Sequence, residues 1–390
     1  MAGAWLLGAD VADAGERPRA VLVAVRQDDR TDEGDPGTEM SLQELRRLAD
    51  TDGLEVVDTV VQTRGRPDPA TYVGSGKADE VAAAVERADA TVVIADGELT
   101  PAQARNLQDG VGARVVDRSA LILDIFASHA RSKEGRLQVE LAQIAYQLPR
   151  LRGASPAMSR VGGGRVAGGA GIGVRGPGEM RLEIQRRRLR QRATRLREGT
   201  SELARRRERT RRRRTRNLVP SVAVAGYTNA GKSALLNRLT GADALAADVL
   251  FATLDPIVRR TSVEGRTVTL TDTVGFVRHL PHQLVDAFRS TLEEVSHGDL
   301  ILHVVDASAP DALSQITTVH GVLQEIGAGQ VPELLVLNKI DIAPAGWVAG
   351  LRRAYPDAEI VSALTGDGVA ALRTAIATRL HDDAAASVPP

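Results

Sequence analysis

Hydrophobic residues in the middle of the chain recur at the spacing of an α-helix, and most residues between them are polar or charged. One stripe follows a 4-3-4-3 spacing, and the other recurs every seven residues with an alanine at a second seam position. Neither stripe can be buried by its own helix, so we predict two helices that pack as an antiparallel hairpin. Pro149 is expected to bend or end the first helix, and Gly199 to fray the second. The first stripe consists of Leu137, Leu141, Ile144, Leu148 and Leu151, and the second of Leu182, Leu189, Ala193, Leu196 and Leu203.

Both ends of the chain alternate short apolar runs with amphipathic stretches. This alternation predicts parallel sheets that are covered by helices. In the C-terminal part, one apolar run leads into a glycine turn and then into a helix from Ser233 onward. The predicted strands are residues 20–25, 91–96, 113–116, 222–225 and 267–270, and the predicted N-terminal helices lie near residues 41–49, 77–87, 100–107 and 119–129.

These patterns place the chain in the α/β class, with three parts of different kinds. We expect an N-terminal α/β domain (1–130), a coiled-coil-like antiparallel hairpin (131–217) and a domain with a mostly parallel sheet (218–380). Residues 381–390 are expected to form a disordered tail. A chain of 390 residues is long enough for two or three such domains.

The composition favours a cytoplasmic protein. The chain has no cysteine, which excludes disulfides and thiolate metal sites. No apolar run approaches the roughly 20 residues of a membrane-spanning helix, and the N-terminus lacks the basic segment of a signal peptide. Aromatic residues make up 3% of the chain, so a stacking platform for single-stranded bases is not expected.

The net charge of zero conceals one strongly basic helix. Residues 181–216 contain 17 arginines and 4 glutamates, and residues 152–178 contain ten glycines, four arginines and no acidic residue. Such a helix suits a polyphosphate partner, and binding should weaken steeply as the salt concentration rises. We interpret the glycine-rich segment as a flexible loop between the helices, with a tip that becomes ordered on RNA.

Four lysines stand against forty-six arginines, and two of the lysines lie in nucleotide-binding motifs. Lys232 lies in the sequence G-x-x-x-x-G-K-S at residues 226–233, which is a phosphate loop. The backbone N–H groups of such a loop point at the α- and β-phosphates, and the following helix adds the positive end of its dipole. We expect Lys232 to reach the β- and γ-phosphates as a catalytic residue, and Ser233 to coordinate Mg²⁺.

Three further motifs follow in the order that a guanine-nucleotide site requires. In D-x-x-G at residues 272–275, Asp272 is expected to hold Mg²⁺, and the Gly275 N–H to meet the γ-phosphate as a second catalytic group. In N-K-x-D at residues 338–341, Asp341 can accept two hydrogen bonds from guanine N1 and N2, which adenine cannot supply. GTP is therefore the expected nucleotide, and S-A-L at residues 362–364 resembles the last guanine-contacting loop. The expected nucleotide contacts are Gly226, Tyr227, Thr228, Asn229, Ala230, Gly231, Lys232, Ser233, Asp272, Thr273, Val274, Gly275, Asn338, Lys339, Asp341, Ser362, Ala363 and Leu364.

Two residues near the phosphates bear on the rate of GTP hydrolysis to GDP and phosphate. Phe276 follows D-x-x-G, where many small GTPases have a glutamine that orients the attacking water. We therefore expect slow intrinsic hydrolysis that a partner stimulates. Asn229 occupies a position similar to that of potassium-activated GTPases, where an amide oxygen can help to hold K⁺. A hydrogen bond from Asn229 to the first switch is the equal alternative.

A second glycine turn, at residues 73–77, carries Lys77. It lacks the full spacing of a phosphate loop and follows no clear strand. We interpret it as the start of a helix, with a second phosphate site as the alternative.

Six segments of the chain resemble the HflX family of ribosome-associated GTPases, and the resemblance extends over residues 20–380. The resemblance identifies residues 251–256 as the first switch. It implies that Phe251, Ala252 and Thr253 contact the nucleotide, with Thr253 as a second Mg²⁺ ligand and a catalytic residue. The six segments are residues 71–80, 117–126, 134–143, 175–179, 251–256 and 272–281.

The resemblance also implies a partner and an action. A protein of this family is expected to bind the large (50S) ribosomal subunit and its RNA through the N-terminal domain and the hairpin. It is expected to split or rescue stalled ribosomes under stress, and to act as a monomer. Two alternatives remain: a GTPase that matures or modifies RNA, and an RNA-binding or remodelling module with a regulatory GTPase domain.

Overall fold

The computed structural model describes residues 17–26, 36–151, 177–216, 219–242, 250–251, 254, 257–278 and 294–386. The chain divides into two compact units. The first consists of Met1–Ser128 and Arg136–Ser201, and the second of His129–Gly135 and Glu202–Pro390. The domain boundaries at 130/131 and 217/218 stay predictions.

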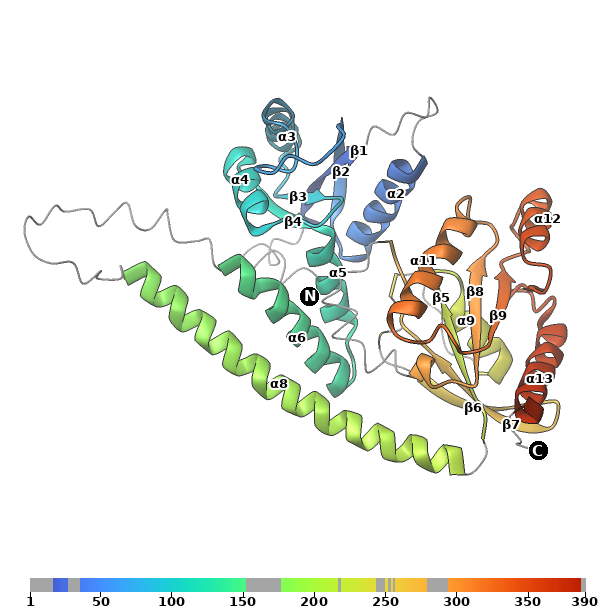
Figure 1. Ribbon diagram of the computed structural model, residues 1–390. Helices are drawn as coiled ribbons and strands as arrows, with labels where there is room; N and C mark the ends of the chain where they lie inside the picture. The colour runs from blue at the N-terminus through green and yellow to red at the C-terminus, as the bar shows by residue number, and fades with distance from the viewer. Residues whose placement is uncertain are drawn as a thin grey trace, which may run out of the picture. The chain divides into compact units, whose positions relative to one another are not determined.

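The first unit contains a four-stranded parallel sheet between helices (Figure 1). Its strands are β1 (Arg19–Arg26), β2 (Glu55–Thr63), β3 (Val92–Ala95) and β4 (Arg114–Asp117), in the spatial order β2-β1-β3-β4. Its helices are α2 (Pro36–Thr51), α3 (Ser75–Ala88), α4 (Pro101–Val111) and α5 (Arg118–His129).

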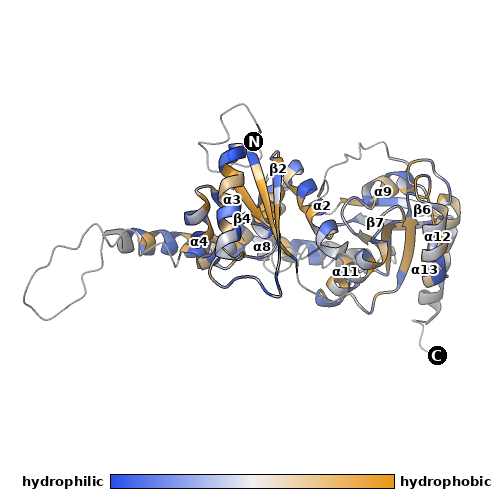
Figure 2. Ribbon diagram, turned by 90° about the horizontal axis from the view of Figure 1, so that it is seen from above, coloured by the Kyte–Doolittle hydropathy of each residue, from blue (hydrophilic) through white to orange (hydrophobic). Residues whose placement is uncertain are grey.

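The faces of this sheet follow from the alternation of side chains along the central strand. Val21 and Val23 of β1 point to one face, where they pack with residues of α3 and α4. Leu22 alternates with them and is also fully buried, as a parallel sheet covered on both faces requires. In Figure 2 hydrophobic colours predominate in the middle of this sheet, and the surrounding helices have mixed colours.

The start of helix α4 has a clear local sequence signal, whereas strand β2 does not. Helix α4 begins at a capping box, in which the Thr100 and Gln103 side chains each bond the other's backbone N–H. Strand β2 was not predicted, because it lies at the edge of the sheet and most of its residues are only partly buried. Asp58 and Gln62 interrupt its apolar pattern.

The hairpin helices α6 (Lys133–Arg150) and α8 (Pro177–Arg216) pack along the predicted stripes (Figure 1). The start of α6 meets a late part of α8, since Leu137 lies beside Gly199 and Glu140 pairs with Arg192 at 2.6 Å, so the helices run antiparallel. The packed residues are Ile144, Ala193 and Leu196, with Leu137, Leu141, Leu148 and Leu189 against them.

The two predictions about helix breakers in the hairpin had different outcomes. Helix α6 ends at Arg150, one residue after Pro149, as expected. The expectation that Gly199 frays α8 was wrong, because α8 continues through this residue. A Cβ at Gly199 would lie 3.3 Å from Leu137 Cδ1, so the glycine allows the two helices to approach closely. The glycine-rich segment at 152–176 lies outside the described residues.

The second unit contains a six-stranded sheet in the order β10-β9-β8-β5-β7-β6. Only β6 runs antiparallel to its neighbour among these strands, so the predicted fold class is confirmed. The strands are β5 (Ser221–Gly226), β6 (Ile257–Val263), β7 (Arg266–Asp272), β8 (Leu300–Asp306), β9 (Glu333–Asn338) and β10 (Glu359–Ile360).

Helices cover both faces of the second sheet. Helices α9 (Lys232–Thr240) and α13 (Val369–Ala386) contribute to a core on one face, and α11 (Ala312–Glu325) and α12 (Ala345–Ala354) to a core on the other. Helix α13 runs into the segment 381–390 that was expected to be a tail. None of the described helices is long and apolar enough to cross a membrane.

Candidate nucleotide-binding site

The phosphate loop lies between β5 and α9, at the carboxyl edge of the second sheet. Two of its glycines are required by close contacts rather than by flexibility. Gly226 has φ +148°, and a Cβ there would collide with the Val304 carbonyl oxygen of β8. Gly231 has φ +90°, and a Cβ there would collide with Asn338 Nδ2. The loop is therefore held against two neighbouring strands with no room for side chains.

Lys232 is buried at the first position of α9, with 7% of its surface exposed. Its Nζ donates a hydrogen bond to the Tyr227 carbonyl at 2.7 Å, which curls the loop around the ammonium group. Burial lowers the pKa of Lys232 to about 8; nearby Asp272 opposes this shift, and Lys339 adds to it. A buried cation in this position would be stabilised by a phosphate group.

Both ends of the D-x-x-G segment, Asp272 and Gly275, lie against the phosphate loop and the start of α9. The Ser233 hydroxyl donates to Asp272 Oδ2 at 2.7 Å. A Cβ on Gly275 would lie 2.8 Å from Thr228 Cγ2 and 3.0 Å from Lys232 Nζ, so this backbone passes directly over the lysine. The structure thus brings together the four residues that the two motifs assign to phosphate and Mg²⁺.

Asn338 joins the phosphate loop to the last loop of the site. Its Nδ2 donates to the Ala230 carbonyl at 2.8 Å, and its Oδ1 accepts from the Ala363 N–H at 2.9 Å. Asn338 is 1% exposed. It therefore braces the phosphate loop and the last loop, and it also lines the cavity beside them.

The expected guanine site is a cavity of about 570 Å³ beside this brace. Asp341 is exposed and lines it, as expected for a carboxylate that binds a base. Lys339, with φ +63°, pairs with Asp306 at 2.7 Å, which fixes the N-K-x-D turn to the end of β8. The lining residues are Gly231, Ala234, Asn237, Arg238, Gly241, Ala242, Asn338, Lys339, Asp341, Ile342, Ala363 and Leu364.

The last loop is held by its own hydrogen bonds and by Arg238 of α9. The Thr365 N–H donates to Ser362 Oγ at 3.1 Å, and Ser362 is fully buried. Arg238 donates from Nε to the Ala363 carbonyl at 3.1 Å, and a second nitrogen of its guanidinium donates to the Leu364 carbonyl. The sequence did not single out Arg238 or Asp306, because their roles depend on contacts between distant segments.

Phe276 is 1% exposed and is paired with the phosphate loop. Its N–H donates to the Gly226 carbonyl at 3.1 Å, and its carbonyl accepts from the Thr228 N–H at 2.7 Å. The side chain is buried, and its backbone fixes D-x-x-G to the loop. This residue therefore has a structural role and cannot hold an attacking water.

The structure describes some of the other predicted site residues and leaves others undescribed. Asn229 is exposed in the phosphate loop, with φ +60°. Thr273 is fully buried and donates to the Val224 carbonyl at 2.8 Å, so its side chain supports β5. Phe251 is 3% exposed, and Val274 is also buried. Ala252 and Thr253 lie outside the described residues, so the role of Thr253 stays a prediction.

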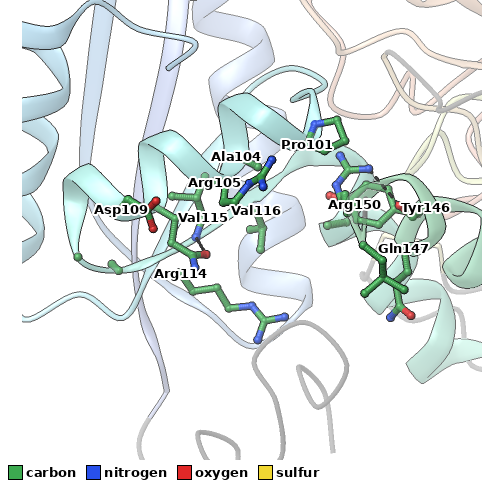
Figure 3. Close-up of a pocket in the computed structure, with 15 residues that line it drawn as sticks. Pro101, Ala104, Arg105, Asp109, Arg114, Val115, Val116, Tyr146, Gln147 and Arg150 are labelled. Carbon is green, nitrogen blue, oxygen red and sulfur yellow. Dashed lines mark hydrogen bonds between the residues drawn. The ribbon is translucent and has the colours of Figure 1, made fainter. Parts of the chain in front are cut away.

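The first unit contains a second and larger cavity of about 840 Å³, along the edge strand β4 (Figure 3). Arg105, Arg114 and Arg150 are among its lining residues, with Asp109 as the acidic one. It is therefore a basic pocket between α4, β4 and the end of α6.

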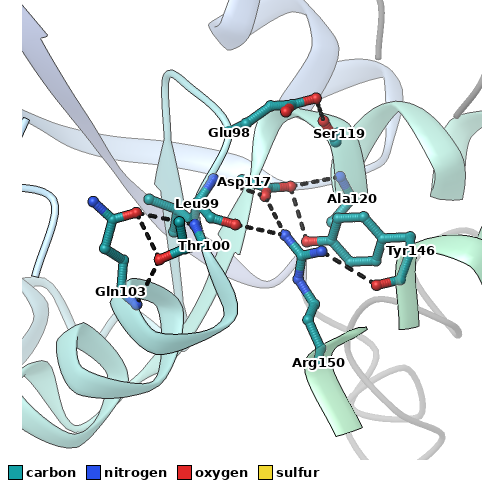
Figure 4. Close-up of polar contacts among 9 residues, drawn as sticks. All are labelled: Glu98, Leu99, Thr100, Gln103, Asp117, Ser119, Ala120, Tyr146 and Arg150. Carbon is teal, nitrogen blue, oxygen red and sulfur yellow. Dashed lines mark hydrogen bonds and ion pairs between the residues drawn. The ribbon is translucent and has the colours of Figure 1, made fainter. Parts of the chain in front are cut away.

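A buried carboxylate fixes one wall of this pocket (Figure 4). Asp117 is 1% exposed and accepts from Tyr146 Oη at 2.9 Å and from Arg150 at 2.7 Å. It also accepts from the Leu99 and Ala120 N–H groups at 3.1 and 2.9 Å. The Arg150 guanidinium stacks 3.4 Å above the Tyr146 ring. This network attaches the last turn of α6 to the sheet, and it was not predicted.

The glycine turn that carries Lys77 is the start of a helix, as interpreted from the sequence. Gly74 is the N-cap of α3, which begins at Ser75. Lys77 pairs with Glu80 of the same helix at 2.6 Å.

The chain is similar to GTPases in each of its parts. It matches three protein-family descriptions: "GTP-binding GTPase N-terminal" over residues 39–127, "GTP-binding GTPase Middle Region" over residues 129–214, and "50S ribosome-binding GTPase" over residues 221–339. A GTPase HflX of Caldanaerobacter subterraneus subsp. tengcongensis is 50% identical over 337 residues, which cover 85% of this chain and 76% of that protein. The GTPase HflX of Escherichia coli is 43% identical over 377 residues, which cover 96% of this chain and 85% of that protein. A solved structure, a GTP-binding protein from Sulfolobus solfataricus in complex with GDP, is 24% identical, covers 94% of this chain and 99% of that one, and has a TM-score of 0.45.

Proposed function

The chain belongs to the HflX family of GTPases, and on that premise we propose that it binds the large ribosomal subunit and splits or rescues stalled ribosomes. It hydrolyses GTP to GDP and phosphate. We further propose that the protein acts in the cytoplasm as a monomer. The ribosomal partner is supported by the match of residues 221–339 to a 50S ribosome-binding GTPase description.

The observation that supports the chemistry most strongly is the convergence of four motifs on one edge of the second sheet. Gly275 passes over Lys232, and Ser233 bonds Asp272. Asn338 connects the phosphate loop with the loop that contains Ala363. We propose Lys232, Gly275 and Thr253 as the catalytic groups that contact the γ-phosphate.

The residues beside the phosphate loop fit a magnesium ion. A hydroxyl oxygen and a carboxylate oxygen lie 2.7 Å apart, and such hard oxygen ligands suit Mg²⁺. Ser233 and Asp272 would hold the ion, with Thr253 as a third ligand. When bound, Mg²⁺ would neutralise charge on the β- and γ-phosphates.

Asn229 supports a further proposal about monovalent cations. Its side chain is exposed in the phosphate loop, where its amide oxygen can help to hold K⁺ against the phosphates. The rate of GTP hydrolysis in KCl should then exceed the rate in NaCl at equal ionic strength. Equal rates would show that K⁺ has no role in hydrolysis.

The contact with ribosomal RNA is assigned to the hairpin and the N-terminal unit. Arg187, Arg190 and Arg197 of α8 are exposed, while the leucine stripe of the same helix faces α6. A row of exposed guanidinium groups suits a phosphate backbone. The basic pocket of Figure 3 adds a second positively charged feature in the same unit.

Sedimentation tests the proposal. Purified protein would be mixed with ribosomes and with a non-hydrolysable GTP analogue, GDP or no nucleotide, and the mixtures separated on sucrose gradients. Co-migration with large subunits and a gain of free subunits in the GTP-analogue sample are expected. RNA binding without any ribosome association would favour an RNA-maturation GTPase instead.

A further inference from the structure

A second group of potential metal ligands lies in the second unit, formed by residues that belong to none of the nucleotide motifs. His303 of β8, His320 of α11 and Glu333 of β9 each offer one ligand atom, and these three atoms lie within 4.8 Å of one another. Glu333 Oε1 is 2.7 Å from His303 Nδ1 and 2.9 Å from His320 Nε2. The two imidazole rings meet edge to face, with centroids 5.3 Å apart.

Regular structure holds all three side chains. In the parallel register of β8 and β9, Ile301 lies opposite Glu333 and His303 opposite Leu335, so the two side chains share one face. Helix α11 packs on that face through Ala312 and Ile316. The cluster is therefore built by two central strands and the helix that covers them, as a precise ligand set requires.

The chemistry of the set favours a transition metal over Mg²⁺. Two imidazole nitrogens and one carboxylate oxygen are a known ligand combination for Zn²⁺, whereas Mg²⁺ prefers oxygen alone. In a tetrahedral zinc site, neighbouring ligand atoms lie roughly 3.3 Å apart. The present separations of 2.7 and 2.9 Å would need to open by about half an ångström.

The burial of the three residues is graded from the core to the surface. His303 has a side chain that is 1% exposed, Glu333 is 28% exposed and His320 is 40% exposed. The inner ligand is thus fixed by packing, and the outer ligand leaves a route by which an ion can enter. A water molecule entering from this side would supply the fourth ligand.

We propose that His303 Nδ1, His320 Nε2 and Glu333 Oε1 bind one divalent transition-metal ion, with Zn²⁺ as the preferred ion. Each nitrogen presents its lone pair to the ion once its hydrogen is on the other ring nitrogen. The ion would link β8, β9 and α11, and it would stabilise the second unit.

The experiment uses the full-length protein after treatment with a chelator, in buffer that contains GDP and Mg²⁺. Co²⁺ is titrated first, because tetrahedral Co²⁺ with nitrogen ligands absorbs visible light far more strongly than octahedral Co²⁺ with oxygen ligands. Zn²⁺ is then added to displace it. We expect one equivalent of strongly absorbing Co²⁺, its displacement by Zn²⁺, and a higher melting temperature with Zn²⁺.

Two variants and a control complete the test. His320→Ala removes the most exposed ligand, and Glu333→Gln removes the carboxylate; each should weaken Co²⁺ binding at least about tenfold. His381→Ala removes an exposed histidine of α13 and should leave binding unchanged. The proposal is overturned if the parent protein gives no strong absorption, because the cluster would then be a hydrogen-bonded triad only. It is also overturned if His320→Ala has a normal melting temperature without metal and still binds Co²⁺ as tightly as the parent does.

Discussion

Asn338 donates a hydrogen bond of 2.8 Å to the carbonyl of Ala230, and this bond joins the N-K-x-D motif to the phosphate loop. The same amide accepts from the Ala363 N–H, and both atoms are buried. The N-K-x-D turn, the phosphate loop and the last loop are therefore one connected assembly.

Asn338→Ala should disrupt this assembly, because both loops lose their hydrogen bond to the amide. Each lost partner leaves a buried polar group unsatisfied, at a cost of about 1–3 kcal/mol. We expect affinity for both GTP and GDP to fall by about 10- to 100-fold, measured by titration with a fluorescent guanine nucleotide. If affinity stayed at the parent level, the brace would be irrelevant to binding. Asn237→Ala, on the cavity wall, is a matched control that should cost much less.

Asp341→Asn should change which base the protein accepts. The carboxylate can accept from guanine N1 and N2, whereas an amide can also donate to the oxygen that xanthine carries in place of the N2 amino group. GTP affinity is expected to fall by at least about 100-fold, and XTP affinity to rise above that of the parent. Competition between the two nucleotides measures the change. A variant that still preferred GTP would show that Asp341 does not read the base.

Replacement of Arg186, Arg187, Arg190 and Arg197 by glutamine should weaken ribosome binding. The leucine stripe that packs on α6 stays intact in this variant, so the hairpin should fold. Each phosphate contact that is lost should lower the slope of log affinity against log salt by about one unit. GTP affinity should not change. An unaltered salt slope would assign these arginines to solvated surface, and Lys232→Ala serves as the converse control, losing nucleotide but keeping basal RNA affinity.

Asp52 makes the stability of the N-terminal unit depend on pH. Its side chain is 2% exposed, and neither carboxylate oxygen meets a hydrogen-bond donor among the described residues. Burial, together with the nearby Asp124, raises the pKa of Asp52 to about 8. The folded protein therefore keeps a proton that the unfolded chain loses above about pH 4, so this group lowers stability as pH rises from about 4 to about 8.

Asp52→Asn should remove that dependence. Between pH 5 and 7 the free energy of unfolding of the parent should fall relative to the variant by up to about 1.4 kcal/mol for each pH unit. Urea unfolding of both proteins at several pH values gives the difference directly. Parallel pH profiles for the two proteins would show that Asp52 does not hold a proton in the folded state.

The sequence predicted those parts of the fold that depend on local pattern. The stripe of Leu189 and Leu196 predicted the hairpin, and the glycine spacing around Lys232 predicted the phosphate loop. Both predictions were possible because helix periodicity and glycine turns are local signals. Strand β2 was missed because an edge strand needs little apolar pattern. Gly199 was misjudged because its role is set by Leu137, which lies on another helix.

The parts of the site that the sequence did not reveal depend on contacts between distant segments. Arg238 supports a loop more than a hundred positions away, and Asp306 is positioned only when β8 lies beside β9. The His303 cluster likewise requires the register of two strands and a helix. Phe276 was identified as unable to orient water, but its pairing with Gly226 emerged only in three dimensions.

The most direct test of the central claim is the rate of GTP hydrolysis with and without purified large ribosomal subunits. Because Phe276 is buried and cannot orient water, the isolated protein should turn over slowly. Saturating large subunits should raise the rate at least tenfold, and by no more than the factor of about 10³–10⁵ that external transition-state stabilisation can supply. A rate that large subunits leave unchanged would contradict a ribosome-stimulated GTPase.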